Sequence, residues 1–307
     1  MATTTAAEGV EQLRRIPAPE QGVGRIAAPT LAIFLVALAL YAGSCALTLA
    51  GAWPWPLSTA VNAVCAFWLF TVSHDAAHNA LSSSRRATLW LGRVATFAFS
   101  PLAGFSTWRF IHMQHHRFTN EHDGSDPDHY THSGPRWSLP LRWATIDLHY
   151  VAFYARRAKG RPAAEKRELV GTWLALVALV ALSVASGHLG DLLVLYVLPM
   201  RLAIVFLAWS FDYLPHAGLE GHTQRSNRFR ATRNRLGAER LLSPLLLNQN
   251  YHLVHHLHPT IPFHRYLQVW RRSERHYLAN DPELSDVRGR PLTQAERARL
   301  VAMAAEH

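Results

Sequence analysis

Four long and almost uncharged apolar runs constrain this chain more than any other feature of its sequence. They cover residues 31–51, 56–72, 170–186 and 192–211, and Arg201 is the only charged residue in them. A helix of about 20 residues, rising about 1.5 Å per residue, crosses the hydrocarbon core of a bilayer. The alternative is a set of buried helices in a water-soluble protein, where neighbouring uncharged runs of this length are rare. We therefore predict an all-α polytopic membrane protein with four transmembrane helices.

A fifth apolar run, residues 92–107, is shorter and is interrupted by Arg93 and Pro101. A charge and a proline within so short a stretch disfavour a complete span. This run predicts a single helix that lies at the membrane interface or re-enters the bilayer from one side.

The distribution of Lys and Arg indicates how the chain is oriented in the membrane. The links at residues 52–55 and 187–191 contain neither residue type. Residues 85–167 and the chain after Gln224 are rich in basic residues, nearly all of them Arg. Basic residues near the ends of membrane spans favour the cytoplasmic side. We expect both basic segments and both termini to be cytoplasmic, where the basic segments form a helical cap on the spans.

The chain divides into one large segment and two short ends. Residues 1–27 lack the order of a signal peptide, and their Ala, Thr, Pro and Glu content predicts a disordered tail. Residues 28–280 contain all the apolar runs without an internal repeat or linker, which predicts one membrane domain. Residues 281–307 are expected to form a cytoplasmic tail with a short helix, because Thr293-Gln294-Ala295-Glu296 matches a capping box.

Composition excludes several classes of protein. The only two cysteines, Cys45 and Cys65, rule out a disulfide framework, a thiolate zinc site and an iron–sulfur cluster. The net charge of +10 is explained by basic segments next to the spans, which also attract anionic lipid. Nucleic-acid binding is not expected, because the basic residues flank the apolar runs and no nucleic-acid-binding motif is present.

The sequence contains 19 histidines, and three clusters of them point to a chemical function. The clusters read His-Asp-Ala-Ala-His, His-Met-Gln-His-His and His-Leu-Val-His-His, and all lie on the predicted cytoplasmic side. Their members are His74, His78, His112, His115, His116, His252, His255 and His256. One further histidine, His216, follows the fourth apolar run in Asp-Tyr-Leu-Pro-His.

Helical spacing makes these clusters candidate metal ligands. Side chains three or four residues apart share one face of a helix, so each cluster is expected to point its rings in one direction. Neutral imidazole binds Fe, Zn and Cu. A zinc site takes three or four protein ligands, whereas eight or nine histidines suit two metal ions. A single pair of histidines arises by chance, but three clusters on one side of a membrane are difficult to explain as core residues.

Together these features resemble the membrane fatty acid desaturase superfamily over about residues 31–270. The resemblance lies in the three histidine clusters, in their order, and in their position relative to four spans. Two longer motifs are similar to the branch that contains bacterial fatty acid desaturases and β-carotene hydroxylases. They are His112-Met-Gln-His-His-Arg-Phe-Thr-Asn with Asp126-Pro127-Asp128, and Asn250-Tyr-His-Leu-Val-His-His-Leu-His-Pro259. The Asn-Tyr-x-Glu-His-Tyr-Gly element of membrane alkane hydroxylases is absent from the sequence.

The resemblance implies that the clusters bind two iron ions (a di-iron centre) and that O₂ is a co-substrate. Members of the family place a further histidine after the fourth span, and His216 occupies that position here. Some members carry Asn four residues before it, where this chain has Asp212. Asp212 is then either an outer carboxylate of the centre or an interfacial residue. The implied reaction is desaturation or hydroxylation of a long-chain lipid. Fatty-acyl desaturation is the first expectation and β-carotene hydroxylation the alternative.

Residues that orient the imidazoles are expected next to the clusters. Metal-binding histidines usually donate their second ring N–H to a carboxylate, a backbone carbonyl or water. Asp75, inside the first cluster, is the first candidate, and Asp126, Asp128 and Asn250 follow it. Arg201, near the middle of the fourth span, has two interpretations. It is either paired or functional inside the membrane, or its long side chain extends to the interface.

The reaction also needs a partner that supplies electrons. No Gly-x-Gly-x-x-Gly motif follows a predicted strand, so no flavin or nicotinamide site is expected. The donor is expected to be a separate ferredoxin or cytochrome b5-like protein that docks on the basic cytoplasmic face. The other partners are the membrane and the lipid substrate. A metal-binding transporter is the remote alternative, because its ligands would lie within the spans or in a flexible loop.

Overall fold

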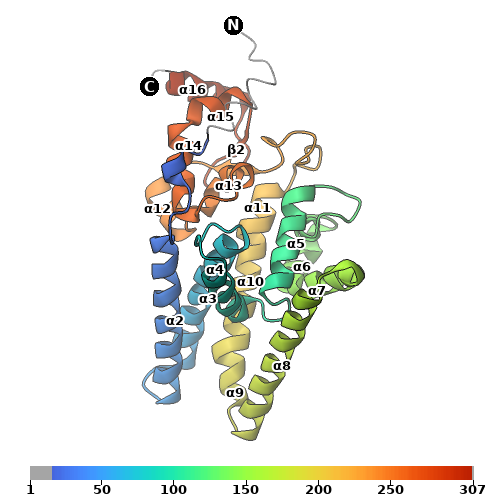
Figure 1. Ribbon diagram of the computed structural model, residues 1–307. Coiled ribbons are helices and arrows are strands. Elements are labelled where there is room, and N and C mark those ends of the chain that lie inside the picture. Colours follow the sequence, from blue (N-terminus) through green and yellow to red (C-terminus); the bar gives the residue numbers. More distant parts are fainter. Residues whose placement is uncertain (1–15, 306–307) are drawn as a thin grey trace.

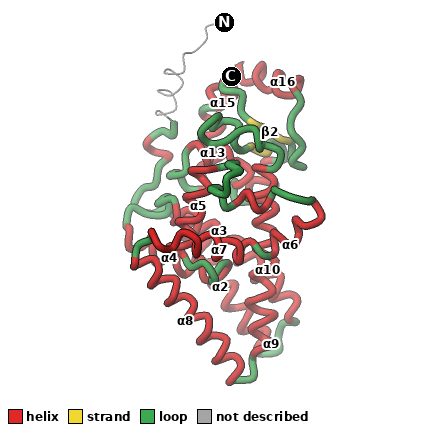
Figure 2. Tube along the Cα trace, turned by 90° about the vertical axis from the view of Figure 1, so that its right-hand side faces the viewer, coloured by secondary structure: helices red, strands yellow, loops and turns green. Residues whose placement is uncertain are grey.

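The computed structural model describes residues 16–305, whose regular structure is almost entirely helical (Figure 1 and Figure 2). Residues 1–15 of the predicted N-terminal tail lie outside the described residues, as do residues 306–307. The described part of that tail contains the short 3₁₀ helix η1 (Pro19–Gln21). It ends with a 2.8 Å backbone hydrogen bond from Ala27 N–H to the carbonyl of Leu81.

Four helices within the described residues are long and apolar enough to cross a membrane, which confirms the predicted spans. They are α2 (Ala28–Leu49), α3 (Trp55–Ala77), α8 (Ala163–Ala185) and the composite helix Leu189–His216. In Figure 1 they form the lower part of the molecule. α3 lies at their centre, with 61% of its apolar window buried, against 6% for α8. Most apolar side chains of α8 are therefore exposed on the protein surface, as expected of a helix that faces lipid.

The composite helix widens where proline interrupts its hydrogen bonding. Its five consecutive parts are α9 (Leu189–Leu192), the π-helix η5 (Leu193–Val197), α10 (Leu198–Leu207), the π-helix η6 (Ala208–Tyr213) and α11 (Leu214–His216). Pro199 has no N–H to offer the carbonyl of Leu195. That carbonyl instead accepts hydrogen bonds from Tyr41 OH at 2.9 Å and from Asn62 Nδ2 at 2.8 Å. Side chains of α2 and α3 therefore satisfy a backbone group that would otherwise be unpaired within the span.

The rest of the chain forms a helical cap at the end of the spans where α3 finishes (Figure 1). Its α-helices are α4 (Arg85–Phe99), α5 (Phe105–Phe118), α6 (Leu139–Ala144), α7 (Ile146–Arg157), α12 (Glu239–Leu245), α13 (His252–Leu257), α14 (Tyr266–Arg272), α15 (Glu274–Ala279) and α16 (Gln294–Ala305). Its further 3₁₀ helices are η2 (Asp128–Thr131), η3 (Arg136–Ser138), η4 (Ala158–Gly160), η7 (Gln249–Tyr251) and η8 (Phe263–Arg265).

A short parallel sheet joins the end of the chain to this cap. β1 (Arg233–Arg235) pairs with β2 (Glu283–Ser285), which belongs to the segment predicted as a C-terminal tail. The helix expected near the C-terminus is present as α16. Its capping box is formed, because Thr293 N–H donates to Glu296 Oε2 at 2.7 Å and Glu296 N–H donates to Thr293 Oγ at 3.3 Å.

The single helix predicted over residues 92–107 is wrong. α4 ends at Phe99, and α5 starts at Phe105 after a turn in which Gly104 has φ of 64°. That conformation favours glycine, and Pro101 cannot continue the hydrogen bonding of α4. The two helices are then held together through α8, since Glu168 accepts hydrogen bonds from the Arg93 guanidinium at 2.7 Å and from Ser106 N–H at 2.7 Å.

Candidate metal centre

All nine candidate histidines lie at the junction between the spans and the cap, on four separate helices. The last turn of α3 carries His74 and the residue that follows α3 is His78, while the remaining seven lie on α5, α11 and α13. Eight of the nine are buried, and His116 is half-buried. The rings pack against both apolar clusters of the molecule, since His74 contacts Phe70 of the spans and His255 contacts Tyr266 of the cap.

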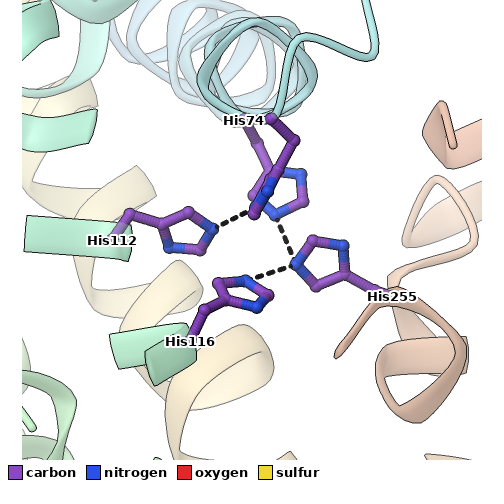
Figure 3. Close-up of side chains that lie close together, drawn as sticks. His74, His112, His116 and His255 are labelled. Atoms are coloured by element: carbon purple, nitrogen blue, oxygen red, sulfur yellow. Dashed lines mark hydrogen bonds between the residues drawn. The ribbon is translucent and has the colours of Figure 1, made fainter. Parts of the chain in front are cut away.

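Five of the nine histidines form one group, named here the five-histidine group. Its members are His74, His78, His112, His116 and His255, and one ring nitrogen of each lies within 4.8 Å of the others. The Nε2 atoms of His78 and His112 are 2.8 Å apart, and His255 Nε2 lies 3.0 Å from His74 Nε2 and 2.8 Å from His116 Nε2. Figure 3 shows rings from α3, α5 and α13 pointing toward one another.

The other four histidines form a second group, named here the four-histidine group. Its members are His115, His216, His252 and His256. His256 Nε2 lies 3.3 Å from His115 Nε2 and 3.1 Å from His252 Nε2. His216 Nε2 is buried and has no hydrogen-bond partner. A buried ring nitrogen without a partner is costly, and a metal ion would remove that cost.

The expectation that each His-x-x-His-His cluster points in one direction is wrong. His112 and His116 belong to the five-histidine group, whereas His115 belongs to the four-histidine group. In the last cluster His255 belongs to the five-histidine group, whereas His252 and His256 belong to the four-histidine group. With 3.6 residues per turn, each residue is rotated by about 100° from the one before it. Viewed down the axis, the fifth residue of the motif is therefore about 40° to one side of the first, and the fourth is about 60° to the other side. Each helix therefore presents rings to both groups.

The donor set fits two metal ions. Metal–imidazole bonds are about 2.0–2.1 Å long, so two nitrogens at right angles on one ion lie about 3 Å apart. The observed Nε2 separations of 2.8–3.3 Å match this value. Burial, together with neighbouring imidazoles, holds the pKa of His78, His112 and His116 well below the usual range. The pKa values of His252, His255 and His256 are lowered in the same way. These rings are neutral near pH 7, as metal binding requires.

Three of the rings are held through their Nδ1 atoms. His115 Nδ1 donates to Asp126 Oδ1 at 3.0 Å and lies 3.4 Å from Asp128 Oδ2. Burial opposes protonation of His115, but Asp128 and Asp126 outweigh it and raise its pKa to about 9. His255 Nδ1 lies 2.9 Å from Tyr266 OH, and His216 Nδ1 lies 3.3 Å from a backbone carbonyl. Nothing in the local sequence around Tyr266 indicated this contact.

Asp126 and Asp128, two of the polar residues expected to support the centre, do lie beside an imidazole. Three others, Asp75, Asn250 and Asp212, form no hydrogen bond with a histidine ring among the described residues. Asp75 accepts hydrogen bonds from Thr30 Oγ at 2.8 Å and from Phe263 N–H at 3.2 Å. It therefore ties α2 and the segment after α13 to α3 rather than orienting a histidine. Asn250 Nδ2 donates to the carbonyl of Arg235 at 3.1 Å. Asp212 lines a pocket beside the five-histidine group.

That pocket is largely apolar and reaches His112. Its apolar wall consists of Phe70, Phe99, Trp108, Ile146, Ile204, Leu207, Ala208 and Phe211. Its polar lining consists of Ser100, His112, Asp128, Asp147, Tyr150 and Asp212. The Trp108 ring stacks on His112 with centroids 5.1 Å apart. The cavity is small, with a volume of about 40 Å³, and it lies directly beside the five-histidine group.

Arg201 is paired inside the protein, which resolves the two interpretations that the sequence left open. Its guanidinium donates to both oxygens of Asp147, at 2.9 Å for Oδ1, and to the carbonyl of Ala144 at 3.0 Å. Asp147 is buried, with 2% of its side chain exposed. The two residues are 54 positions apart, and no spacing pattern in the sequence predicts their contact.

Among the histidines outside the two groups, His132 comes near the centre and His188 lies far from it. The His132 ring stacks on His216 with centroids 6.3 Å apart. His188 is exposed in the link between α8 and α9, where its Nδ1 lies 2.6 Å from Asp191. That link is at the opposite end of the spans from the cap (Figure 1). His307 lies outside the described residues.

Comparison with known proteins identifies the family. The model of the fatty acid desaturase family matches residues 50–286. The chain is 31% identical, over 64% of its length and 71% of the relative, to a β-carotene ketolase of Paracoccus sp. (strain N81106 / MBIC 01143). It is 27% identical, over 69% of its length and 65% of the relative, to the dihydrorhizobitoxine desaturase of Bradyrhizobium elkanii. The chain, an integral membrane protein with four apolar spans, therefore belongs to the fatty acid desaturase family of oxidoreductases.

Proposed function

We propose that this protein holds two iron ions on its nine clustered histidines and uses O₂ to oxidise a C–H bond of a lipid. The observation that carries the proposal is the pair of adjoining, mostly buried histidine groups beside an apolar pocket at one end of the spans. The proposed ligands are His74, His78, His112, His116 and His255 for one ion, and His115, His216, His252 and His256 for the other.

Bound iron would supply the redox chemistry with O₂ that acid–base side chains lack. The chain itself contributes orientation and a dry site. Asp126 and Tyr266 hold His115 and His255 through their Nδ1 atoms. Phe211 packs edge-on against His252 with centroids 4.5 Å apart, and Trp108 covers His112. These aromatic rings keep water from the space where a substrate C–H bond would lie.

The electron balance of the reaction requires an external donor. Reduction of O₂ to water takes four electrons. Desaturation removes two from the substrate as a double bond forms, and the donor supplies the other two along with two protons. Hydroxylation likewise consumes two donor electrons, leaving one oxygen atom in the product. We propose a ferredoxin or a cytochrome b5-like protein as the donor, docked on the basic face of the cap. We also propose that this face is cytoplasmic, because its segments are rich in Arg.

Two substrate classes have support. Fatty-acyl desaturation is supported by the family match over residues 50–286. Oxidation of a carotenoid ring, as a hydroxylase or a related oxygenase, is supported by the two Paracoccus β-carotene ketolases, which are 31% and 30% identical to this chain. Both reactions place a long apolar molecule in the membrane with one C–H bond at the metal centre.

Expression in a carotenoid-producing host and in a host that makes none separates these classes. Mass spectrometry of extracted lipids is expected to show either new unsaturated acyl chains in both hosts or oxidised carotenoids in the first alone. The purified protein is expected to contain about two irons per chain and to consume O₂ with lipid and donor. Bound zinc without O₂ consumption would instead favour the metal-binding transporter.

A further inference from the structure

Two adjoining cavities form one groove on the molecular surface, along α4 and the facing part of α8, named here the α4–α8 groove. The larger cavity, with a volume of about 790 Å³, is mostly apolar and includes Phe97. The smaller, of about 370 Å³, is lined by Arg85 and Arg86 among others. Trp90 and Arg93 line both cavities, which are therefore continuous. The groove shares no residue with the cavity beside the five-histidine group, so it is a separate feature of the protein.

The groove runs from the level of the membrane surface to the depth of the spans. Its basic end begins at Arg85, just after Ser82, whose hydroxyl donates to the carbonyl of Arg25 at 2.7 Å. Arg25 immediately precedes the span α2, so this end lies where the span begins. At the apolar end, Tyr196 of the composite span donates from its OH to the carbonyl of Phe97, and the two rings stack with centroids 6.1 Å apart. Phe97 therefore lies alongside a transmembrane helix.

The groove carries more positive charge than the protein neutralises. Glu168 is its only acidic lining residue, and it pairs with Arg93 at 2.7 Å. The other three arginines of the groove, Arg85, Arg86 and Arg167, are exposed and form no ion pair within residues 16–305. Four arginines against one glutamate leave a net charge of +3. Basic residues flank many spans, but here they lie along a groove whose other end is apolar.

We propose that the α4–α8 groove binds one anionic phospholipid, with its headgroup at Arg85 and Arg86 and one acyl chain along Trp90 and Phe97. Guanidinium groups bind phosphate oxygens through paired N–H donors. Trp90, 60% exposed, lies between the two ends, at the depth where aromatic rings favour the membrane interface. A free phosphate ion would leave the apolar end empty, and a water-soluble protein would not reach Phe97. The lipid also packs against α8, only 6% of whose apolar window is buried by the protein.

Lipid binding to the full-length protein tests this inference without turnover. Delipidated protein in detergent is titrated with dioleoyl phosphatidylglycerol, which is anionic, or with dioleoyl phosphatidylcholine, which has the same acyl chains and no net charge. Native mass spectrometry counts the lipids bound per chain. We expect one phosphatidylglycerol to bind at least about tenfold more tightly than phosphatidylcholine, because each basic residue near a membrane surface strengthens binding to anionic lipid about fivefold. Excess inorganic phosphate should not displace it, because phosphate lacks the acyl chain.

Two variants test the charged end and the apolar end of the groove separately. Arg85→Gln/Arg86→Gln should remove most of the preference for phosphatidylglycerol and leave phosphatidylcholine binding unchanged. Gly171→Phe should fill the apolar end, because a Cβ at Gly171 meets no atom within 4 Å. It should weaken both lipids at least about tenfold, since several CH₂ groups of the chain lose their burial. The matched control is Arg288→Gln/Arg299→Gln, which removes the same charge from exposed positions of the cap and should retain the preference.

Equal affinity for the two lipids, or a preference that survives Arg85→Gln/Arg86→Gln, would overturn the inference. Loss of the preference in the control variant would also overturn it, because net charge alone would then explain the binding. Thermal unfolding gives a second measurement, since a ligand of the folded state stabilises it. Phosphatidylglycerol should raise the unfolding midpoint of the unmodified protein more than that of Arg85→Gln/Arg86→Gln. Neither measurement depends on iron, so a failure of the proposed function would leave this result unchanged.

Discussion

Two double variants test how the histidines are divided between the two groups. His115→Ala/His116→Ala removes neighbours in the sequence that belong to different groups. His115→Ala/His256→Ala removes residues 141 positions apart that belong to the same group, with their Nε2 atoms 3.3 Å from each other. Both variants lose two imidazoles, so any difference between them reports on tertiary structure alone.

The expected metal contents follow from the number of ligands left in each group. The His115→Ala/His116→Ala variant keeps four histidines in the five-histidine group and three in the four-histidine group. Each group therefore retains at least three ligands, the number found in catalytic metal sites. The second leaves five of five and two of four. Loss of an outer partner alone weakens a metal site about 10–100-fold, and loss of a direct ligand should cost at least as much. The first variant should therefore bind about two weakened ions, and the second about one.

Anaerobic titration of the purified variants with Fe²⁺, and with Co²⁺ as a visible probe, measures both contents and affinities. His188→Ala is the matched control, because this histidine is exposed at the opposite end of the spans and should leave both ions in place. One ion in His115→Ala/His116→Ala and two ions in His115→Ala/His256→Ala would refute this division of the ligands.

Three further predictions follow from contacts around the centre. Asp126→Asn removes the carboxylate that holds His115 Nδ1 and should weaken the ion in the four-histidine group about 10–100-fold; unchanged metal titration would contradict this role. Arg201→Met leaves Asp147 buried without its cation. The substitution should lower the free energy of unfolding by about 3 kcal/mol, which is the low end for a buried ion pair because the guanidinium is 28% exposed. Adding Asp147→Leu to Arg201→Met should recover part of this loss. Thermal unfolding in detergent measures both, and a double variant as unstable as the single one would argue against the pair. Metal-free protein should lose stability as the pH falls below about 6.5, the pKa of histidine in an unfolded chain. Six histidines of the two groups have folded pKa values well below that, so the unfolded state takes up protons first; His115, raised to about 9, acts in the opposite direction but is one against six. Unfolding midpoints that are equal at about pH 7 and about pH 5 would contradict this reasoning.

Much of the fold could be predicted because its signals are contiguous in the chain. A span depends on apolar composition over about 20 neighbouring residues, and all four spans were predicted on that basis. The candidate ligands were also visible, because a helix turns spacings of three and four into neighbouring side chains. The break between α4 and α5 was missed, although Pro101 lies inside it and Gly104 takes a positive φ there.

One supporting contact was among the expected ones, since Asp126 was a candidate from the sequence and it holds His115 Nδ1. Most of the others could not be predicted, because they join residues distant in the chain. Asp75 was expected to hold an imidazole, yet its oxygens accept from Thr30 and from the backbone of Phe263, 188 positions away. Arg201 finds its counter-ion on α7 rather than at the membrane interface. Such pairs depend on how helices approach one another, and a single sequence carries no periodic signal for that.

The sequence by itself determined that this chain has four spans and carries nine histidines that are candidate metal ligands, since both features depend on residues close together in the chain. Only the tertiary structure decided which imidazoles lie together in one group. Adjacent residues on a helix project about 100° apart, so His115 and His116 point into different histidine groups. The approach of α3, α11 and α13 to α5 determines which rings each of them meets.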